Sequence, residues 1–79
     1  MKSYEVTVEF CMQWNYAPKA ASLAEDLFTH FRSDIKNMTL TPGTGGVFEV
    51  TVNGKKLYSK DDTGLFPKNR DIIESMEAL

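Results

Sequence analysis

The dipeptide Asn53-Gly54 constrains the fold of this chain more than any other single feature. It separates two short segments, 48–52 and 55–59, and the first of them alternates apolar and polar side chains. Asn-Gly is a favoured pair for a two-residue hairpin, because both residues of such a turn need positive φ and these two adopt it at little cost. The sequence therefore predicts an antiparallel β-hairpin over 48–59.

The N-terminal part of the chain predicts a strand, a helix and a second strand. Apolar side chains alternate with polar ones over 4–10, which is typical of a strand with one buried and one solvated face. After a connection over 11–17, Pro18 suits the first turn of a helix, and apolar residues recur at helical spacing until about Arg32. Weaker alternation predicts a strand over 35–40, and the segment 41–46 then breaks the chain.

The remaining segments complete the predicted fold. We expect 60–68 to be a polar loop, with Asp61 and Asp62 at its tip, and the apolar residues over 72–79 to form a terminal helix. The order is β-α-β-β-β-α, with the first two strands parallel across a right-handed helical crossover. This is a two-layer α/β (α+β) arrangement of the thioredoxin-like type, with two helices on a mixed four-stranded sheet.

Two helices leave one face of such a sheet without a cover. The polar residues that alternate along the strands are expected to line this open face: Glu5, Thr7, Glu9, Glu49 and Thr51. The open edge of the sheet could support a weak dimer, so we expect a monomer or a weak dimer.

The composition limits the possible classes of protein. With 79 residues, 42% hydrophobic and 25% charged, we expect one globular domain over 1–79. A net charge of −2 with scattered lysines argues against a nucleic-acid partner. The chain has no run approaching the roughly 18 apolar residues of a membrane helix, and its start does not resemble a signal peptide. A single cysteine cannot form an internal disulfide, which suits a reducing, cytoplasmic location.

That single cysteine, Cys11, is the candidate reactive group. It follows the first predicted strand and precedes the first predicted helix. A thiolate in such a position can be stabilised by a helix N-terminus and nearby cations while it stays open to reactants. Lys19 could provide one such cation, or it could simply be solvated. The alternative is that Cys11 is a small hydrophobic residue packed under the helix.

Three segments resemble the selenoprotein W, T and H group, also called the Rdx family. They read VEFCMQWNYAPK over 8–19, TPGTGGVFEV over 41–50 and GLFP over 64–67. The resemblance implies a thioredoxin-like fold with a Cys-x-x-Cys or Cys-x-x-selenocysteine site at the end of the first strand. It makes Cys11 the attacking cysteine, with Met12 and Gln13 between the two redox positions. The family is associated with thiol redox homeostasis and glutathione-linked chemistry.

Trp14 occupies the second redox position. An indole cannot resolve a mixed disulfide, so a dithiol cycle within this chain is impossible. A monothiol cycle remains, in which Cys11 forms a mixed disulfide with glutathione or a partner protein, or a sulfenic acid, and an external thiol releases it. Glutathione would then be a co-substrate, and no cofactor is implied.

A redox-inactive binding module is the alternative hypothesis. It would use the 11–16 loop or the open sheet face to hold another protein. Trp14 could then be an exposed anchor with Tyr16 beside it, although we favour Trp14 as a packing plug over the site. The redox hypothesis predicts fast alkylation of Cys11, whereas the binding hypothesis predicts a sluggish thiol.

Pro42 precedes the third predicted strand, where thioredoxin-like proteins often place a cis-proline facing the reactive cysteine. The sequence does not give the isomer, and about 5–6% of X-Pro bonds are cis. The nearby Gly43, Gly45 and Gly46 are better explained by a turn than by a phosphate-binding loop, because their spacing matches no such motif. His30 has no metal-ligand spacing to other residues, so we expect no metal site.

Overall fold

The computed structural model describes residues 2–79 and contains the hairpin that Asn53-Gly54 predicts. Strands β3 (Phe48–Val52) and β4 (Lys55–Ser59) pair antiparallel, and the turn residues have φ of 52° and 80°. The Asn53 side chain also ties the turn to the neighbouring strand. Its Oδ1 accepts the Glu5 N–H at 2.9 Å, and its Nδ2 donates to the Ser3 carbonyl at 3.2 Å.

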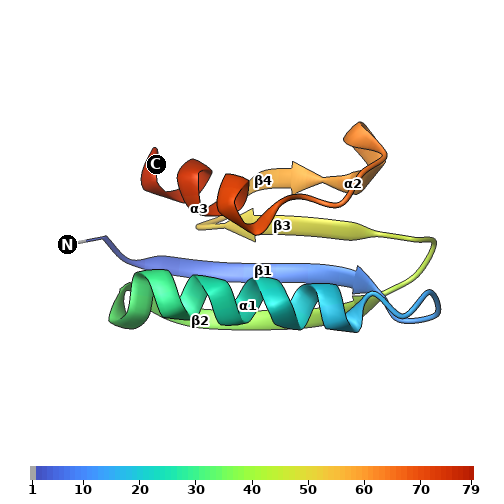
Figure 1. Ribbon diagram of the computed structural model, residues 1–79, viewed down its shortest axis with the longest axis horizontal. Coiled ribbons are helices and arrows are strands. Elements are labelled where there is room, and N and C mark those ends of the chain that lie inside the picture. The colour runs from blue at the N-terminus through green and yellow to red at the C-terminus, as the bar shows by residue number, and fades with distance from the viewer. Residues whose placement is uncertain (1) are drawn as a thin grey trace.

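The sheet has four strands in the order β2-β1-β3-β4 (Figure 1). Strand β1 (Tyr4–Cys11) is parallel to β2 (Ile35–Gly43) and antiparallel to β3. The sheet is therefore mixed, as predicted, with β1 inside it and with β2 and β4 at its edges.

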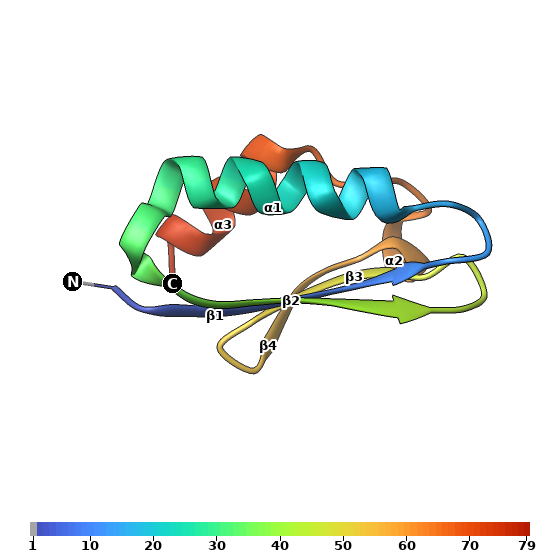
Figure 2. The ribbon, with the colours of Figure 1, turned by 90° about the horizontal axis from the view of Figure 1, so that it is seen from below.

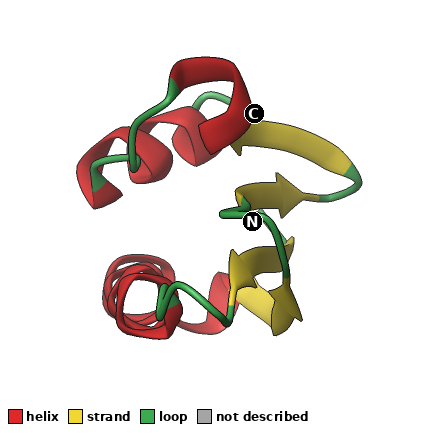
Figure 3. Cartoon of the chain, turned by 90° about the vertical axis from the view of Figure 1, so that its right-hand side faces the viewer, coloured by secondary structure: helices red, strands yellow, loops and turns green. Residues whose placement is uncertain are grey.

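The two longer helices, α1 (Ala17–Phe31) and α3 (Asn69–Glu77), cover the same face of the sheet (Figure 2). A 3₁₀ turn, η1 (Arg32–Asp34), leads from α1 into β2, and a one-turn helix, α2 (Lys60–Thr63), follows β4. Figure 3 shows the resulting two layers, helices on one side and strands on the other. The predicted β-α-β-β-β-α order and thioredoxin-like class are confirmed, with η1 and α2 added.

The apolar core lies between these layers. It combines one face of each central strand with the apolar stripes of α1 and α3, as the period-two and helical patterns require. Its most buried members include Tyr4, Val6, Val8, Phe10, Ala20, Leu23, Leu27, Phe48, Val50, Val52, Ile72 and Met76. Each large side chain buried in this way contributes about 1.5–3 kcal/mol relative to an exposed one.

The opposite face of the sheet carries no helix among residues 2–79 (Figure 2). Glu5, Thr7 and Glu9 are exposed there, as predicted. Glu49 is the exception, because it is only 8% exposed. The prediction that Glu49 is solvated is wrong because β4 supplies it with polar partners.

Those partners are Ser59 and Lys56. Ser59 Oγ donates to Glu49 Oε2 at 2.7 Å, and Lys56 Nζ lies 2.9 Å from Glu49 Oε1. Burial acts to raise the pKa of the Glu49 carboxyl, but hydrogen bonds from Lys56 and Ser59 and the charge of Lys56 outweigh it, so the pKa lies below its usual value. Glu49 is therefore a satisfied carboxylate.

Strand β2 extends beyond its predicted end at Leu40. It continues through Pro42 to Gly43, so the loop that was predicted over 41–46 instead runs over 44–47. An edge strand tolerates a proline, because a missing N–H that faces solvent costs no ladder bond. No peptide bond in residues 2–79 is cis, so Pro42 follows a trans bond.

Smaller differences concern the ends of elements. Strand β1 includes Cys11, α1 begins at Ala17 with Pro18 in its first turn, and α3 begins at Asn69. Helix α2 occupies part of the predicted 60–68 loop and contains Asp61 and Asp62, so the loop prediction is wrong there. Within 2–79, every helix is too short or too polar to cross a bilayer.

Candidate redox site at the end of β1

The backbone around Cys11 is held on three sides. Its N–H donates to the Val47 carbonyl at 2.8 Å, and its carbonyl accepts the Tyr16 N–H at 3.1 Å. The next residue, Met12, donates its N–H to the Gly43 carbonyl at 3.1 Å. Cys11 therefore joins three segments: β1, the turn that leads into α1, and the loop between β2 and β3.

The Cys11 thiol is free but fully buried, with 0% of the residue exposed. The expectation of an open thiol at a strand-to-helix junction is therefore wrong for this conformation. This burial fits the alternative interpretation of Cys11 as a small buried hydrophobic residue, although Cys11 is not in the apolar cluster that contains Phe10. Alternation along β1 explains this difference, because adjacent side chains point to opposite faces of the sheet.

Gly43 identifies what lies beside Cys11. The two residues are direct partners in the parallel pairing of β1 and β2, so their side-chain positions face the same way. A Cβ atom on Gly43 would lie 2.7 Å from Val47 Cγ1 and 2.8 Å from Glu9 Oε2. The side chains of Val47 and Glu9 thus fill the space over Gly43, next to Cys11.

The turn after Cys11 is tight and carries exposed side chains. The Asn15 N–H donates to the Met12 carbonyl at 3.1 Å, and Asn15 has φ of 59°, a region that asparagine tolerates better than most residues. Gln13 is exposed, and Met12 is 57% exposed. The turn therefore returns the chain toward α1 and presents its side chains to solvent.

Trp14 packs through one edge of its indole ring. A Cβ on Gly46 would lie 2.6 Å from Trp14 Cζ3, so the ring rests on this glycine. The rest of the side chain faces solvent, and the residue is 60% exposed. The preferred interpretation of Trp14 as a packing plug is only partly right, because the ring packs on Gly46 but most of the residue is exposed.

Aromatic rings continue from Trp14 into the core. Trp14 and Tyr16 meet edge-to-face with centroids 6.1 Å apart, and Tyr16 and Phe66 do so at 4.6 Å. Phe66 in turn contacts the core residue Phe48 at 5.3 Å. The loop before α3 is therefore part of the packing around the site; the family resemblance included this segment, but the sequence indicated no contact for it.

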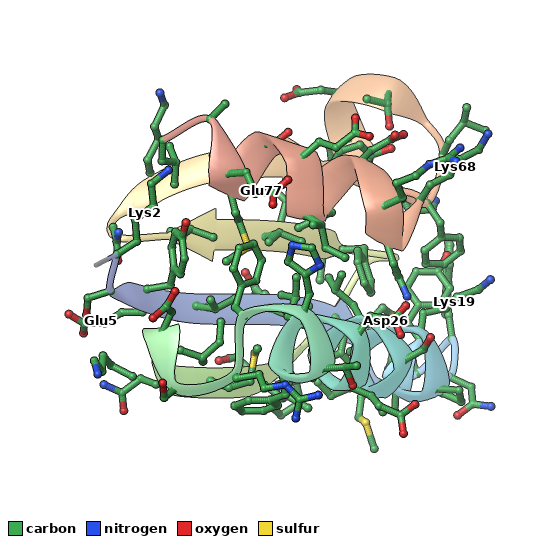
Figure 4. The ribbon with its side chains drawn as sticks, turned by 60° about the vertical axis from the view of Figure 1, so that its left-hand side comes forward. Lys2, Glu5, Lys19, Asp26, Lys68 and Glu77 are labelled. Carbon is green, nitrogen blue, oxygen red and sulfur yellow. The ribbon has the colours of Figure 1, made fainter. Side chains whose placement is uncertain are left out.

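Two lysines border these rings. Lys19 Nζ lies 5.2 Å from the Phe66 centroid, and Lys60 Nζ lies 5.6 Å from the Tyr16 centroid. Both distances suit cation–π contacts, which contribute about 0.5–1 kcal/mol at exposed sites. Lys19, which the sequence offered as a cation for the thiolate, thus has an aromatic partner near the start of α1 (Figure 4).

Other titratable groups gather at the opposite end of β1, near Lys2 and Glu77 (Figure 4). His30 Nε2 lies 3.0 Å from Glu77 Oε2, and both side chains are about half exposed. The Tyr4 hydroxyl donates to the Met76 carbonyl at 3.2 Å, and burial, followed by the charges of Asp34 and Glu77, raises the pKa of Tyr4. These groups are separated from Cys11 by the length of the strand.

Comparison with known proteins bears on the site at Cys11. The Rdx family model matches residues 5–78. This chain belongs to the Rdx family. The match includes Cys11 and Trp14 and confirms the family that the three segments indicate.

Solved structures agree with the family match. The crystal structure of a selenoprotein W-related protein from Vibrio cholerae superposes with a TM-score of 0.93 at 26% identity, covering 98% of this chain and 96% of that one. A protein from Bordetella parapertussis superposes at 0.92 with 29% identity, covering 96% of each chain. No curated protein sequence matches this Rdx chain.

The Rdx fold brings some predicted site residues together and not others. Cys11 ends β1, and Trp14 and Tyr16 lie in the turn that follows it. Pro42 is on β2, where it pairs with Phe10 of β1 and is exposed. Four residues that contact the site were not predicted to have a site role: Glu9, Gly46, Val47 and Phe66. All four lie within the three segments that resemble the Rdx family, and this resemblance was the available signal.

Proposed function

We propose that this Rdx protein is a monothiol redox protein, in which Cys11 forms mixed disulfides with glutathione or with protein thiols. One observation carries the proposal: the only cysteine ends β1 in a thioredoxin-like fold, at the first redox position of the family. A lone thiol of this kind functions best in a reducing compartment such as the cytoplasm.

The chemistry uses two exchange steps. The Cys11 thiolate attacks one sulfur of glutathione disulfide, forms the Cys11–glutathione disulfide and expels a glutathione thiolate. A second glutathione thiolate then attacks the glutathione sulfur of this mixed disulfide, which restores the Cys11 thiolate and regenerates glutathione disulfide. With a protein disulfide in place of the first reactant, the same steps reduce the protein. Trp14 has no sulfur, so the resolving thiol must come from outside the chain.

Burial of Cys11 adds a requirement to this cycle. A reactant reaches the sulfur only when the structure around Cys11 opens, and we infer that the Trp14 turn or the 44–47 loop moves, since both hydrogen bond to the Cys11 backbone. Exposed turns of this kind open locally at a small fraction of the free energy of global unfolding. The reaction rate should therefore depend on the contact between Trp14 and Gly46.

Intact mass after incubation with glutathione disulfide tests the proposal. We expect one glutathionyl group per chain, lost on addition of excess reduced glutathione, and none on Cys11→Ser. Failure of the native protein to react, with rapid modification in urea, would overturn the redox function.

A binding function is the second candidate, and the exposure of the site favours it. Met12, Trp14 and Leu65 are 57%, 60% and 69% exposed, while the thiol itself is fully buried. Large exposed aromatic side chains are frequent anchors in protein interfaces. This function would hold if Cys11→Ser left the capture of a protein partner unchanged and Trp14→Ala abolished it.

A further inference from the structure

We propose that a surface cavity at the start of β1 binds a small organic cation, a primary amine attached to an apolar or aromatic body. The cavity has a volume of about 390 Å³, which is within the range of sites that hold small ligands. Six residues line it: Lys2, Tyr4, His30, Phe31, Asp34 and Glu77. It lies at the opposite end of β1 from Cys11, so the inference goes beyond the proposed redox function and does not depend on it.

Two aromatic rings provide the apolar part of the cavity. The rings of Tyr4 and Phe31 have centroids 4.8 Å apart. Tyr4 is 2% exposed and Phe31 is half-buried, so packing holds both rings in place. Aromatic rings pack against other aromatic groups, and their faces attract cations. This wall therefore suits a ligand with a flat apolar body and a positive charge.

The cations of the cavity already have partners. His30 Nε2 lies 3.0 Å from Glu77 Oε2, and Lys2 Nζ donates to the Glu77 carbonyl at 2.5 Å. That carbonyl belongs to the last turn of α3, where unpaired carbonyls and the helix dipole favour positive charge. An anionic ligand would have to compete with Glu77 for either cation.

The groups that remain available are hydrogen-bond acceptors. In residues 2–79, the half-buried Asp34 carboxylate has no hydrogen bond or ion pair. The Tyr4 hydroxyl donates its proton to the Met76 carbonyl at 3.2 Å, which leaves its oxygen free to accept. Burial, followed by the charges of Asp34 and Glu77, raises the pKa of Tyr4, so the potential at this hydroxyl is negative.

A primary amine matches these free groups. It is protonated at pH 7, and its ammonium offers three donors and no acceptor. Asp34 can therefore pair with the charge while the hydroxyl of Tyr4 accepts a second hydrogen bond. A neutral or anionic ligand of the same shape would leave the Asp34 carboxylate without a counter-charge.

Lys2 gives the inference a second, opposite consequence. Its ammonium contacts the Glu77 carbonyl at the same end of β1 (Figure 4), so an ammonium is already accepted by this part of the cavity. The same positive charge repels a second cation. Removal of the Lys2 charge should therefore strengthen amine binding, whereas removal of the Asp34 charge should weaken it.

The test is an NMR titration of the full chain, labelled with ¹⁵N, at pH 7 and low salt. The probes are benzylamine, benzyl alcohol and benzoate, which share one ring and differ in charge. We expect saturable shifts with benzylamine at residues 2–4, 30–34 and 77, and weaker binding of the other two probes. Asp34→Asn should weaken benzylamine binding roughly 10-fold, and Lys2→Gln should strengthen it roughly two- to threefold.

Glu25→Gln is the matched control, because Glu25 is an exposed carboxylate of α1 outside the cavity, and it should bind benzylamine as wild type does. Benzoate binding as tight as benzylamine, or weaker benzylamine binding to Lys2→Gln, would overturn the assigned charge of the ligand. Absence of saturable shifts at the cavity would overturn the site.

Two further variants keep the result clear. The exposed Lys2 tests the same charge dependence if the spectrum of Asp34→Asn shows that this variant does not fold. Cys11→Ser should bind benzylamine as wild type does, so failure of the redox function and failure of the amine site are separate results.

Discussion

The ring of Trp14 rests on Gly46, close enough that a Cβ at 46 would lie 2.6 Å from Cζ3 of the indole. Gly46 also has φ of 78°, so it meets two requirements, positive φ and close approach. This contact connects the turn after β1 to the loop between β2 and β3, and both segments hydrogen bond to the backbone near Cys11. We therefore expect the accessibility of the thiol to depend on this contact between segments that are distant in sequence.

Gly46→Ala should weaken this contact. We expect the free energy of unfolding to fall by about 2 kcal/mol or more. Alanine at positive φ is destabilised by roughly 1–2 kcal/mol, and its Cβ would also collide with the Trp14 ring. Gly45→Ala is the matched control, since Gly45 has φ of 72° but open space around it. Iodoacetamide labelling of Cys11 should accelerate only in Gly46→Ala. Equal labelling of both variants would show that Trp14 does not cover the thiol.

Trp14→Ala removes the other partner of the contact between Trp14 and Gly46. Because the residue is 60% exposed, we expect the unfolding free energy to change by only about 1 kcal/mol. The labelling rate of Cys11 should nevertheless rise several-fold, whereas Met12→Ala, in the same turn, should leave it unchanged. A Trp14→Ala protein with wild-type labelling would assign the protection to Val47 instead.

Glu49 should make stability depend on pH in the acidic range. Its pKa is lowered in the folded protein, so its contribution is fully present above the unfolded value of about 4.5 and is lost as pH falls through the folded value. Glu49→Gln should therefore cost about 1–2 kcal/mol at pH 7 and progressively less toward pH 3, measured by urea unfolding. Glu5→Gln should show no such difference. A loss that persists at low pH would indicate a packing effect.

Substitutions at Asn53 can separate the contribution of the turn conformation from that of the Asn53 side-chain hydrogen bonds. Asn53→Gly keeps the positive φ but removes the bonds to Glu5 and Ser3, so a loss of about 1 kcal/mol is expected. Asn53→Ala adds the cost of alanine at positive φ, for a total of about 2–3 kcal/mol. Equal urea midpoints for the two variants would contradict this division.

The local patterns of the sequence determined most of the fold. Period-two alternation specified β1 and β3, helical spacing specified α1, and Asn53-Gly54 specified the hairpin, because each depends on neighbouring residues alone. The segments around Cys11 indicated the family. The lack of a second sulfur at Trp14 excluded a dithiol cycle within the chain, because that exclusion depends on residue identity and not on geometry.

Only the tertiary structure decided the state of the site. The burial of Cys11, the exposure of Trp14, the satisfied charge of Glu49 and the place of Pro42 in an edge strand all depend on segments far apart in the chain. The position of the Glu9 carboxylate depends on the register that pairs Cys11 with Gly43. Alternation shows which face a side chain takes, but which groups meet it there is set by the pairing of strands, and that pairing is a property of the whole fold.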